Sequence, residues 1–120
     1  MADDVRKFKL KRKSVPVVME DENGNEFACE LREMTGAERD QWLNGMAGRM
    51  RVDAQGNPVG VAKFDGLQAD LIALCLYQAD TRVPKSQIVG YPASVQTELF
   101  KICQEINSLG DKAREEAKNG

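Results

Sequence analysis

A helix start in the middle of the chain constrains the fold more than any other feature of the sequence. Thr35 is followed three residues later by Glu38, which is the spacing of a capping box. In that motif the hydroxyl and the carboxylate each bond a backbone amide that the first helical turn leaves unpaired. Before Thr35 the apolar residues follow strand-like patterns, and after it they recur at helical spacing. We therefore expect a β unit first and helices after it.

The strand-like part predicts an antiparallel hairpin. Residues 15–19 are rich in β-branched side chains, and residues 26–32 alternate apolar and polar. Between them, residues 21–25 contain an Asn-Gly pair, which favours a tight turn. Pro16 has no amide donor, so we expect it at the start of a strand or on an outer edge.

A basic segment, residues 6–13, precedes the hairpin. Its Phe8 and Leu10 alternate with lysines, as they would on a half-buried strand. We interpret it as a solvated strand whose lysines discourage edge-to-edge pairing. The alternative is a phosphate-binding arm, although the segment has no aromatic platform and no recognition helix follows it. Since the net charge is -2, the whole molecule has no electrostatic reason to approach nucleic acid.

The first predicted helix spans about residues 35–51. Its apolar positions recur at helical spacing and are Trp42, Leu43, Met46, Ala47 and Met50. Gly45 and Gly48 weaken the helix by up to about 1 kcal/mol each relative to alanine. We expect it to need tertiary or intersubunit contacts. Glycine, asparagine and proline crowd together in residues 53–60, which predicts a flexible loop.

Two further helices are predicted, at about residues 65–78 and 92–109. The earlier one begins with Asp65 as a cap and is apolar almost all round in its second half, as a central or partner-covered helix is. Residues 79–91 are interpreted as a connection that carries a turn of helix. The later helix begins at Pro92, a residue favoured in the first helical position, and shows one apolar face.

These elements predict an α+β domain, mostly α, in which an antiparallel hairpin precedes three helices. The domain is expected to cover residues 1–110, and residues 111–120 to form a charged, flexible tail. Hydrophobic residues make up 42% of the chain and charged residues 30%, the balance of a soluble globular protein. The longest apolar run, residues 71–77, is too short to cross a bilayer, and the start is acidic, unlike a secretory signal. A cytoplasmic location follows as the expectation.

Catalytic and cofactor chemistry find little support in the sequence. The chain has no histidine, and its carboxylates and lysines form no cluster that pairs a base with a nucleophile. Cys29, Cys75 and Cys103 are widely spaced and odd in number, so we interpret them as small buried hydrophobes rather than metal ligands. We predict a protein that is not an enzyme and that holds no cofactor.

The remaining candidate for a functional feature is the apolar surface of the predicted helices. Methionine is flexible and polarisable, so a methionine-bearing stripe can repack against different partner helices as well as fill a core. The candidate partner-binding residues are Trp42, Met46, Met50, Leu71 and Leu99. Each of them taken alone is also compatible with a place in the core.

Three segments match, in order, stretches of one known family. Residues 31–40, LREMTGAERD, are similar to its R-E-L-T-G-x-E-R-D stretch. Residues 66–76, GLQADLIALCL, look like its G-L-x-A-x-L-x-A-L-S-L helix, and residues 92–109 resemble its L-P-x-x-V…L-N-x-L ending. The family is that of the tail assembly chaperones of phages with long, flexible, non-contractile tails.

The resemblance implies a protein of the infected host's cytoplasm that is not retained in the mature virion. Proteins of this family coat the tape measure protein and help recruit tail tube (major tail) subunits around it. Covering a long rod implies many copies, so the resemblance also favours a homo-oligomer. A minor tail or tube-joining subunit of the virion stays open as an alternative, as does a small nucleic-acid-binding regulator that uses residues 6–13.

The family also makes a longer form of some copies by a ribosomal frameshift. Ala117, Lys118 and Asn119 can be encoded by GCA-AAA-AAC, which contains the slippery heptamer A-AAA-AAC. These residues are therefore the predicted frameshift region. The nucleotide sequence of the gene tests this prediction.

Overall fold

A computed structural model describes residues 5–61 and 65–109 of the 120-residue chain. The elements follow the chain as β1 (Ser14–Glu20), β2 (Glu26–Arg32), α1 (Gly36–Ala47), β3 (Met50–Val52), β4 (Pro58–Val61), α2 (Leu67–Cys75), β5 (Leu76–Gln78), β6 (Thr81–Arg82), α3 (Lys85–Ile88) and α4 (Ala93–Ile106). The predicted α+β class is confirmed. The described part of the chain holds four helices rather than three, and two antiparallel sheets make it less dominated by helix than predicted.

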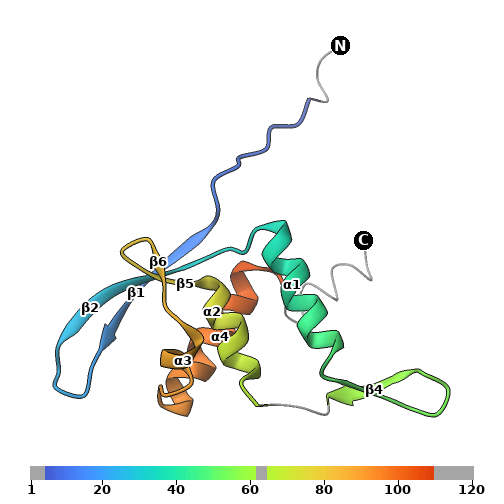
Figure 1. Cartoon of the computed structure of the whole chain (residues 1–120). Coiled ribbons are helices and arrows are strands. Elements are labelled where there is room, and N and C mark those ends of the chain that lie inside the picture. Colours follow the sequence, from blue (N-terminus) through green and yellow to red (C-terminus); the bar gives the residue numbers. More distant parts are fainter. Residues whose placement is uncertain (1–4, 62–64, 110–120) are drawn as a thin grey trace.

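The larger sheet has four antiparallel strands in the order β1-β2-β5-β6 (Figure 1). The predicted hairpin forms its first two strands, with Ser14 opposite Arg32 and Glu20 opposite Glu26. Its turn is closed by Asp21, whose Oδ1 accepts the amides of Asn23 and Asn25, each at 2.9 Å. Because β1 is an edge strand, Pro16 lies on an outer edge, as its missing donor predicts.

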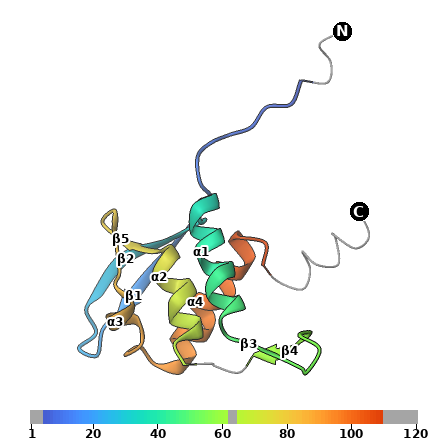
Figure 2. The same cartoon turned by 45° about the vertical axis from the view of Figure 1, so that its right-hand side comes forward.

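The core lies where α2 and α4 meet the sheet. Figure 2 shows α1, α2 and α4 beside one another, with the hairpin β1–β2 on the side away from α1. The most deeply buried side chains are Leu31, Leu71, Ile72, Leu76, Ile88, Cys75 and Cys103. The prediction of a central second helix is confirmed, since most of α2 is enclosed. All three cysteines are free thiols and buried, as predicted.

The first predicted helix is too long, because α1 ends at Ala47 and residues 50–52 form β3. The predicted loop over residues 53–60 is wrong at its end, since residues 58–60 belong to β4, whereas residues 53–57 form the turn of a second hairpin, β3–β4. Asp53 Oδ1 accepts the amides of Gln55 and Asn57, each at 2.9 Å, as Asp21 does in the first hairpin. Both turns place a glycine at positive φ, 82° at Gly24 and 85° at Gly56.

The second and third predicted helices are also shorter in the structure. Gly66, with φ 69°, is the N-cap of α2 and no side chain caps the helix, so the prediction of an Asp65 cap is wrong. The helix stops at Cys75 because Leu76 pairs with Leu31 of β2, which converts the end of the predicted helix into β5. The predicted turn of helix in the connection is present as α3. Pro92 occupies the N-cap of α4, one position before the predicted place.

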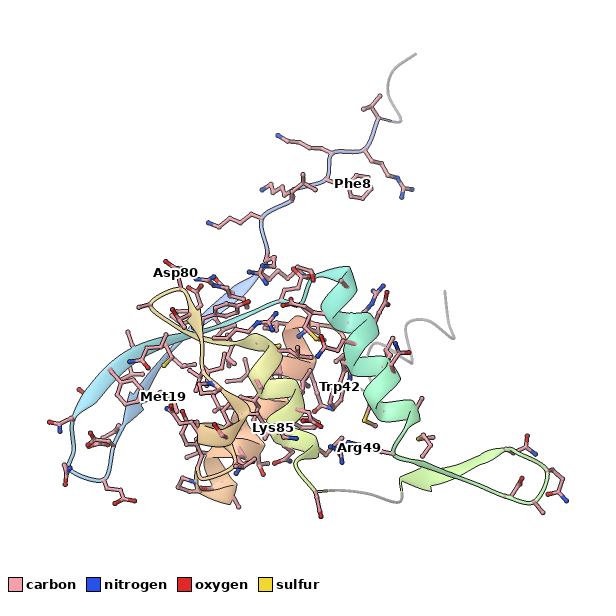
Figure 3. All side chains as sticks on the ribbon, viewed as in Figure 1. Phe8, Met19, Trp42, Arg49, Asp80 and Lys85 are labelled. Atoms are coloured by element: carbon pink, nitrogen blue, oxygen red, sulfur yellow. The ribbon has the colours of Figure 1, made fainter. Side chains whose placement is uncertain are left out.

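The basic segment is not a half-buried strand, so that prediction is wrong. We call residues 5–13 the N-terminal arm; they leave the body as an extended chain from the start of β1 (Figures 1 and 3). Phe8 and Leu10 are 78% and 96% exposed. The predicted tail, residues 111–120, and the frameshift residues Ala117, Lys118 and Asn119 lie outside the described residues.

Candidate functional site

The predicted capping box is confirmed and does more than begin α1. Thr35 N donates to Glu38 Oε1 at 2.8 Å, and Glu38 N donates to Thr35 Oγ1 at 3.2 Å. The same carboxylate lies 3.5 Å from Arg12 Nη1 and forms an ion pair with Arg82. One side chain therefore connects the root of the N-terminal arm, the start of α1 and strand β6.

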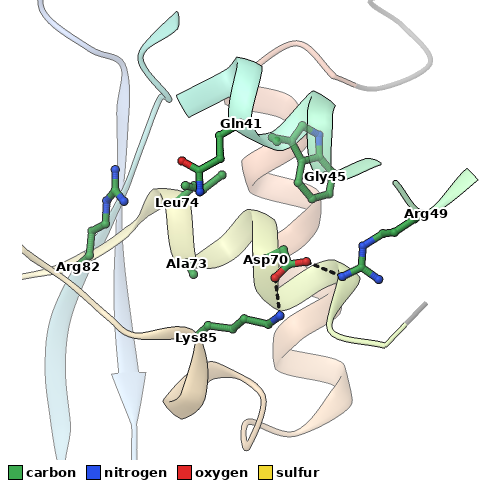
Figure 4. A pocket seen from close by; sticks show the side chains of 9 residues that line it. Gln41, Gly45, Arg49, Asp70, Ala73, Leu74, Arg82 and Lys85 are labelled. Atoms are coloured by element: carbon green, nitrogen blue, oxygen red, sulfur yellow. Dashed lines mark hydrogen bonds and ion pairs between the residues drawn. The ribbon is translucent and has the colours of Figure 1, made fainter. Parts of the chain in front are cut away.

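A groove runs beside α1 over the surface of α2 (Figure 4). Its volume is about 420 Å³, and its apolar lining comes from Trp42 of α1 with Ala73 and Leu74 of α2. Its polar lining consists of Gln41, Arg49, Asp70, Arg82 and Lys85. A groove with an apolar floor and a charged rim suits an amphipathic segment better than a small reacting molecule.

An ion-pair cluster closes one end of this groove. Asp70 Oδ2 lies 2.5 Å from Arg49 Nη2, and Asp70 Oδ1 lies 2.6 Å from Lys85 Nζ (Figure 4). Burial opposes ionisation of Asp70, but hydrogen bonds and charges from Lys85 and Arg49 outweigh it and lower the pKa of this carboxyl. A carboxylate held ionised between two cations is suited to orienting charge and not to donating a proton near neutral pH.

The predicted partner-binding residues do not form a single exposed face. Leu71 and Leu99 are buried in the core, and Trp42 is buried with its ring edge-on to Phe100 at a centroid distance of 6.4 Å. Met46 is half-buried against the core, whereas Met50 is exposed. The accessible part of the set is therefore on and just after α1.

Leu43, on α1, was not among the predicted partner-binding residues; it is 49% exposed and does not line the groove. Three charged residues of the groove were also not predicted from the sequence. Arg49, Arg82 and Lys85 supply the charges of the rim. The available signal was Asp70, the one charged residue of α2, because a partly buried carboxylate needs a partner.

Three segments that are far apart in the sequence, residues 31–40, 66–76 and 92–109, meet at Asn107. Its Oδ1 accepts the amide of Met34 at 2.8 Å, and its Nδ2 donates to the Cys103 carbonyl at 2.8 Å. Nδ2 also lies 3.6 Å from Cys75 Sγ. Met34, Cys75 and Asn107 come from the first, second and third of those segments.

Neither a metal-binding cluster nor a membrane-spanning helix is present in the described ranges. Residues 5–61 and 65–109 hold no group of three histidine, cysteine, aspartate or glutamate side chains that could bind a metal ion. None of the helices in those ranges has the length and apolar character needed to cross a membrane. Comparison of the chain with models of known protein families, with curated proteins and with solved structures finds no match.

Proposed function

We propose that the chain is a tail assembly chaperone of a phage with a long, flexible tail. In this role it binds the tape measure protein, keeps it soluble and promotes polymerisation of the tail tube around it. The observation that carries the proposal is that α1 is only partly buried by its own chain. Trp42 is its one buried side chain and also lines the groove of about 420 Å³, while Leu43 remains half exposed.

A helix held in this way is suited to receiving a second helix. Leu43 and Met50 are exposed large apolar side chains, and Met46 is half-buried near them. Burial of such side chains against a partner is favourable by roughly 25 cal/mol per Å² of apolar area. Methionines adapt to partner surfaces of different shape, and a tape measure presents many similar helical stretches.

The charged rim of the groove supports recognition of a polar stripe on the same partner. In the rim, Arg49 and Lys85 pair with the carboxylate of Asp70, and Arg82 pairs with Glu38. A partner helix with acidic residues beside its apolar face would complement this excess of positive charge. Each contact is small, so the affinity for the tape measure would come from avidity over many copies. Weak individual contacts would still allow tail tube subunits to replace the chaperone.

The remaining parts of the proposal follow from the resemblance. They are an oligomer in the host cytoplasm, a frameshifted longer form, recruitment of the major tail protein and absence from the mature virion. Mass spectrometry of purified particles tests the last part. Stoichiometric peptides of this chain in virions would favour the alternative, a structural subunit of the tail.

Co-expression with the tape measure protein tests the proposal. The wild-type chain is expected to raise the soluble fraction of the tape measure, and the variant with Leu43→Asp and Met50→Asp is expected to lose this effect. Both side chains are exposed, so the variant should keep its fold, as circular dichroism can check. Val89→Asp, at another exposed apolar site, is the matched control and should act like wild type. The proposal would be contradicted if the tape measure protein were equally soluble with the wild-type chain and with both variants, or if none of the three chains raised its soluble fraction.

A further inference from the structure

Strand β1 has one free edge. Within residues 5–61 and 65–109, β2 is the strand that pairs with it. The Lys13 carbonyl accepts a hydrogen bond from the Glu33 amide at 2.8 Å, and the Asp21 amide donates to the Asn25 carbonyl. The backbone N–H and C=O groups of odd-numbered residues therefore point toward β2. Successive residues of a strand direct these groups to opposite sides, so those of the even-numbered residues of β1 point away from β2. Pro16 removes one donor from this edge, and the other groups are available for pairing.

The N-terminal arm has a strand pattern and no strand partner in the described part of its own chain. All of residues 5–11 are exposed. Phe8 and Leu10 alternate with lysines, the period of a strand with one apolar face. Figure 3 shows Phe8 far from the body of the molecule. Two large apolar side chains are therefore left in water unless a partner covers them.

The root of the arm is fixed in a way that directs it away from its own β1. The guanidinium of Arg12 lies 5.5 Å from the centre of the Tyr77 ring and 3.5 Å from Glu38. Lys13 N donates to Glu33 Oε1 at 3.0 Å. The arm continues the direction of β1 (Figure 1), so pairing with its own strand would require a reversal at these two residues and the loss of their contacts.

Charge complementarity identifies a second copy as the occupant of the edge. The tip of the β1–β2 hairpin carries a group of acidic residues, Glu20, Asp21, Glu22 and Glu26. The arm carries a group of basic residues, Arg6, Lys7, Lys9, Lys11, Arg12 and Lys13. In one molecule these groups lie at opposite ends of β1 (Figure 1). An arm that lies antiparallel on the β1 edge of another copy brings its basic end to the acidic tip.

We propose that residues 6–12 of one copy add as an antiparallel strand to the free edge of β1 in a second copy. An arm that keeps the backbone alternation of β1 directs its even-numbered residues to the even-numbered residues of the edge, and one such register places Phe8 opposite Val18 and Arg6 opposite Glu20. An aromatic residue beside a β-branched one and an opposite-charge pair are both favourable across strands. This register also covers Val18, which is 67% exposed. The register is reciprocal, so the two copies form a two-fold dimer.

The oligomeric state of the full chain at increasing concentration tests the inference. Sedimentation velocity is expected to show a reversible dimer for wild type. The dissociation constant should rise about tenfold or more with Phe8→Ala and Leu10→Ala together, because the two-fold dimer contains each of the two cross-strand pairs twice and loses four pairs. Arg6→Glu and Glu20→Arg should each weaken the dimer, and the chain carrying both changes should regain it. Val89→Ala is the control and should leave the dissociation constant unchanged, because this exposed residue follows α3 and belongs to neither the arm nor β1.

Cross-linking between two differently altered chains tests the register. A Phe8→Cys chain mixed with a Val18→Cys chain should form a mixed disulfide-linked pair under mild oxidation, since the native cysteines are buried. Replacing the second chain with a Val89→Cys chain should give no such product. A monomer at all concentrations, a dimer insensitive to the arm changes, or salt-sensitive binding of nucleic acid by a monomeric arm would overturn the inference. These outcomes leave the test of the exposed apolar residues Leu43 and Met50 unaffected, so the two proposals can fail separately.

Discussion

At the scale of single residues, a few polar side chains hold separate segments together. Asn107 joins the end of α4 to the segment between β2 and α1, and Asp70 joins α2 to Arg49 and Lys85. Buried or half-buried polar groups of this kind are costly when one partner is removed, because the other is left without a hydrogen bond. Their loss should therefore be visible in stability measurements.

Asn107→Ala is expected to lower the free energy of unfolding by about 1–3 kcal/mol, the usual cost of an unsatisfied buried group. The amide of Met34 would lose its acceptor. Urea denaturation followed by circular dichroism measures the change. Asn44→Ala, at an exposed position of α1, is the control and should change stability by less than about 0.5 kcal/mol. If Asn107→Ala lowered the free energy of unfolding no more than the control does, the hydrogen bonds of Asn107 would not be important for stability.

Asp70 is expected to make stability depend on pH in the acid range. Its pKa is lowered from an ordinary value of 3.8, so the folded state binds the proton less readily than the unfolded chain does. This contribution is fully present above the unfolded pKa and is lost as the pH falls through the folded pKa. Wild type should therefore exceed Asp70→Asn in stability at pH 7, and the difference should shrink as the pH falls below 3.8. A difference that stays constant from neutral pH to pH 3 would refute this assignment.

At the scale of elements, the two hairpins show what the sequence could and could not predict. The first was predicted from its Asn-Gly pair and flanking strand patterns. The second was missed because its strands are short, although Asp53, Gly56 and Asn57 repeat the spacing of Asp21, Gly24 and Asn25. The shared Asp-x-x-Gly-Asn spacing reflects a shared physical cause, an aspartate that accepts two amides and a glycine at positive φ.

Glycine replacements in the second hairpin and in α1 should have opposite effects. Gly56→Ala should destabilise the protein by about 1 kcal/mol, because its φ of 85° is unfavourable for a residue with a Cβ. Gly45→Ala should stabilise it by up to about 1 kcal/mol, since the position is helical and a Cβ there meets no atom within 4 Å. Thermal denaturation of both variants measures the two signs. The same sign for both would contradict the conformational explanation.

Helix ends were predicted less well than helices, for a tertiary reason. The periodicity of the second predicted helix continues through Leu76 and Tyr77, yet both residues pair with β2. Local pattern cannot reveal that a strand is available beside them. The N-terminal arm is the converse case, in which a strand pattern is present and its own chain supplies no partner strand within the described residues.

At the scale of the whole molecule, the predicted apolar helical faces are shared between the core and the surface. Periodicity identified Leu71 and Leu99 as apolar positions but could not say what covers them, and the fold itself does so. The capping box was predictable because its residues are three apart. The cluster of Arg49, Asp70 and Lys85 was not, because folding brings together residues from three different elements or connections.

Hydrogen–deuterium exchange of the chain with and without the tape measure protein is the most direct test of the central claim, that a partner helix binds along α1. Binding is expected to slow the exchange of backbone amides in residues 36–47. In the free chain Trp42 is the one buried side chain of this helix, and the partner would cover the exposed side. Amides of the β1–β2 hairpin should not change at a protein concentration where the chain's own oligomeric state is constant. Protection that leaves α1 unaffected would contradict the account.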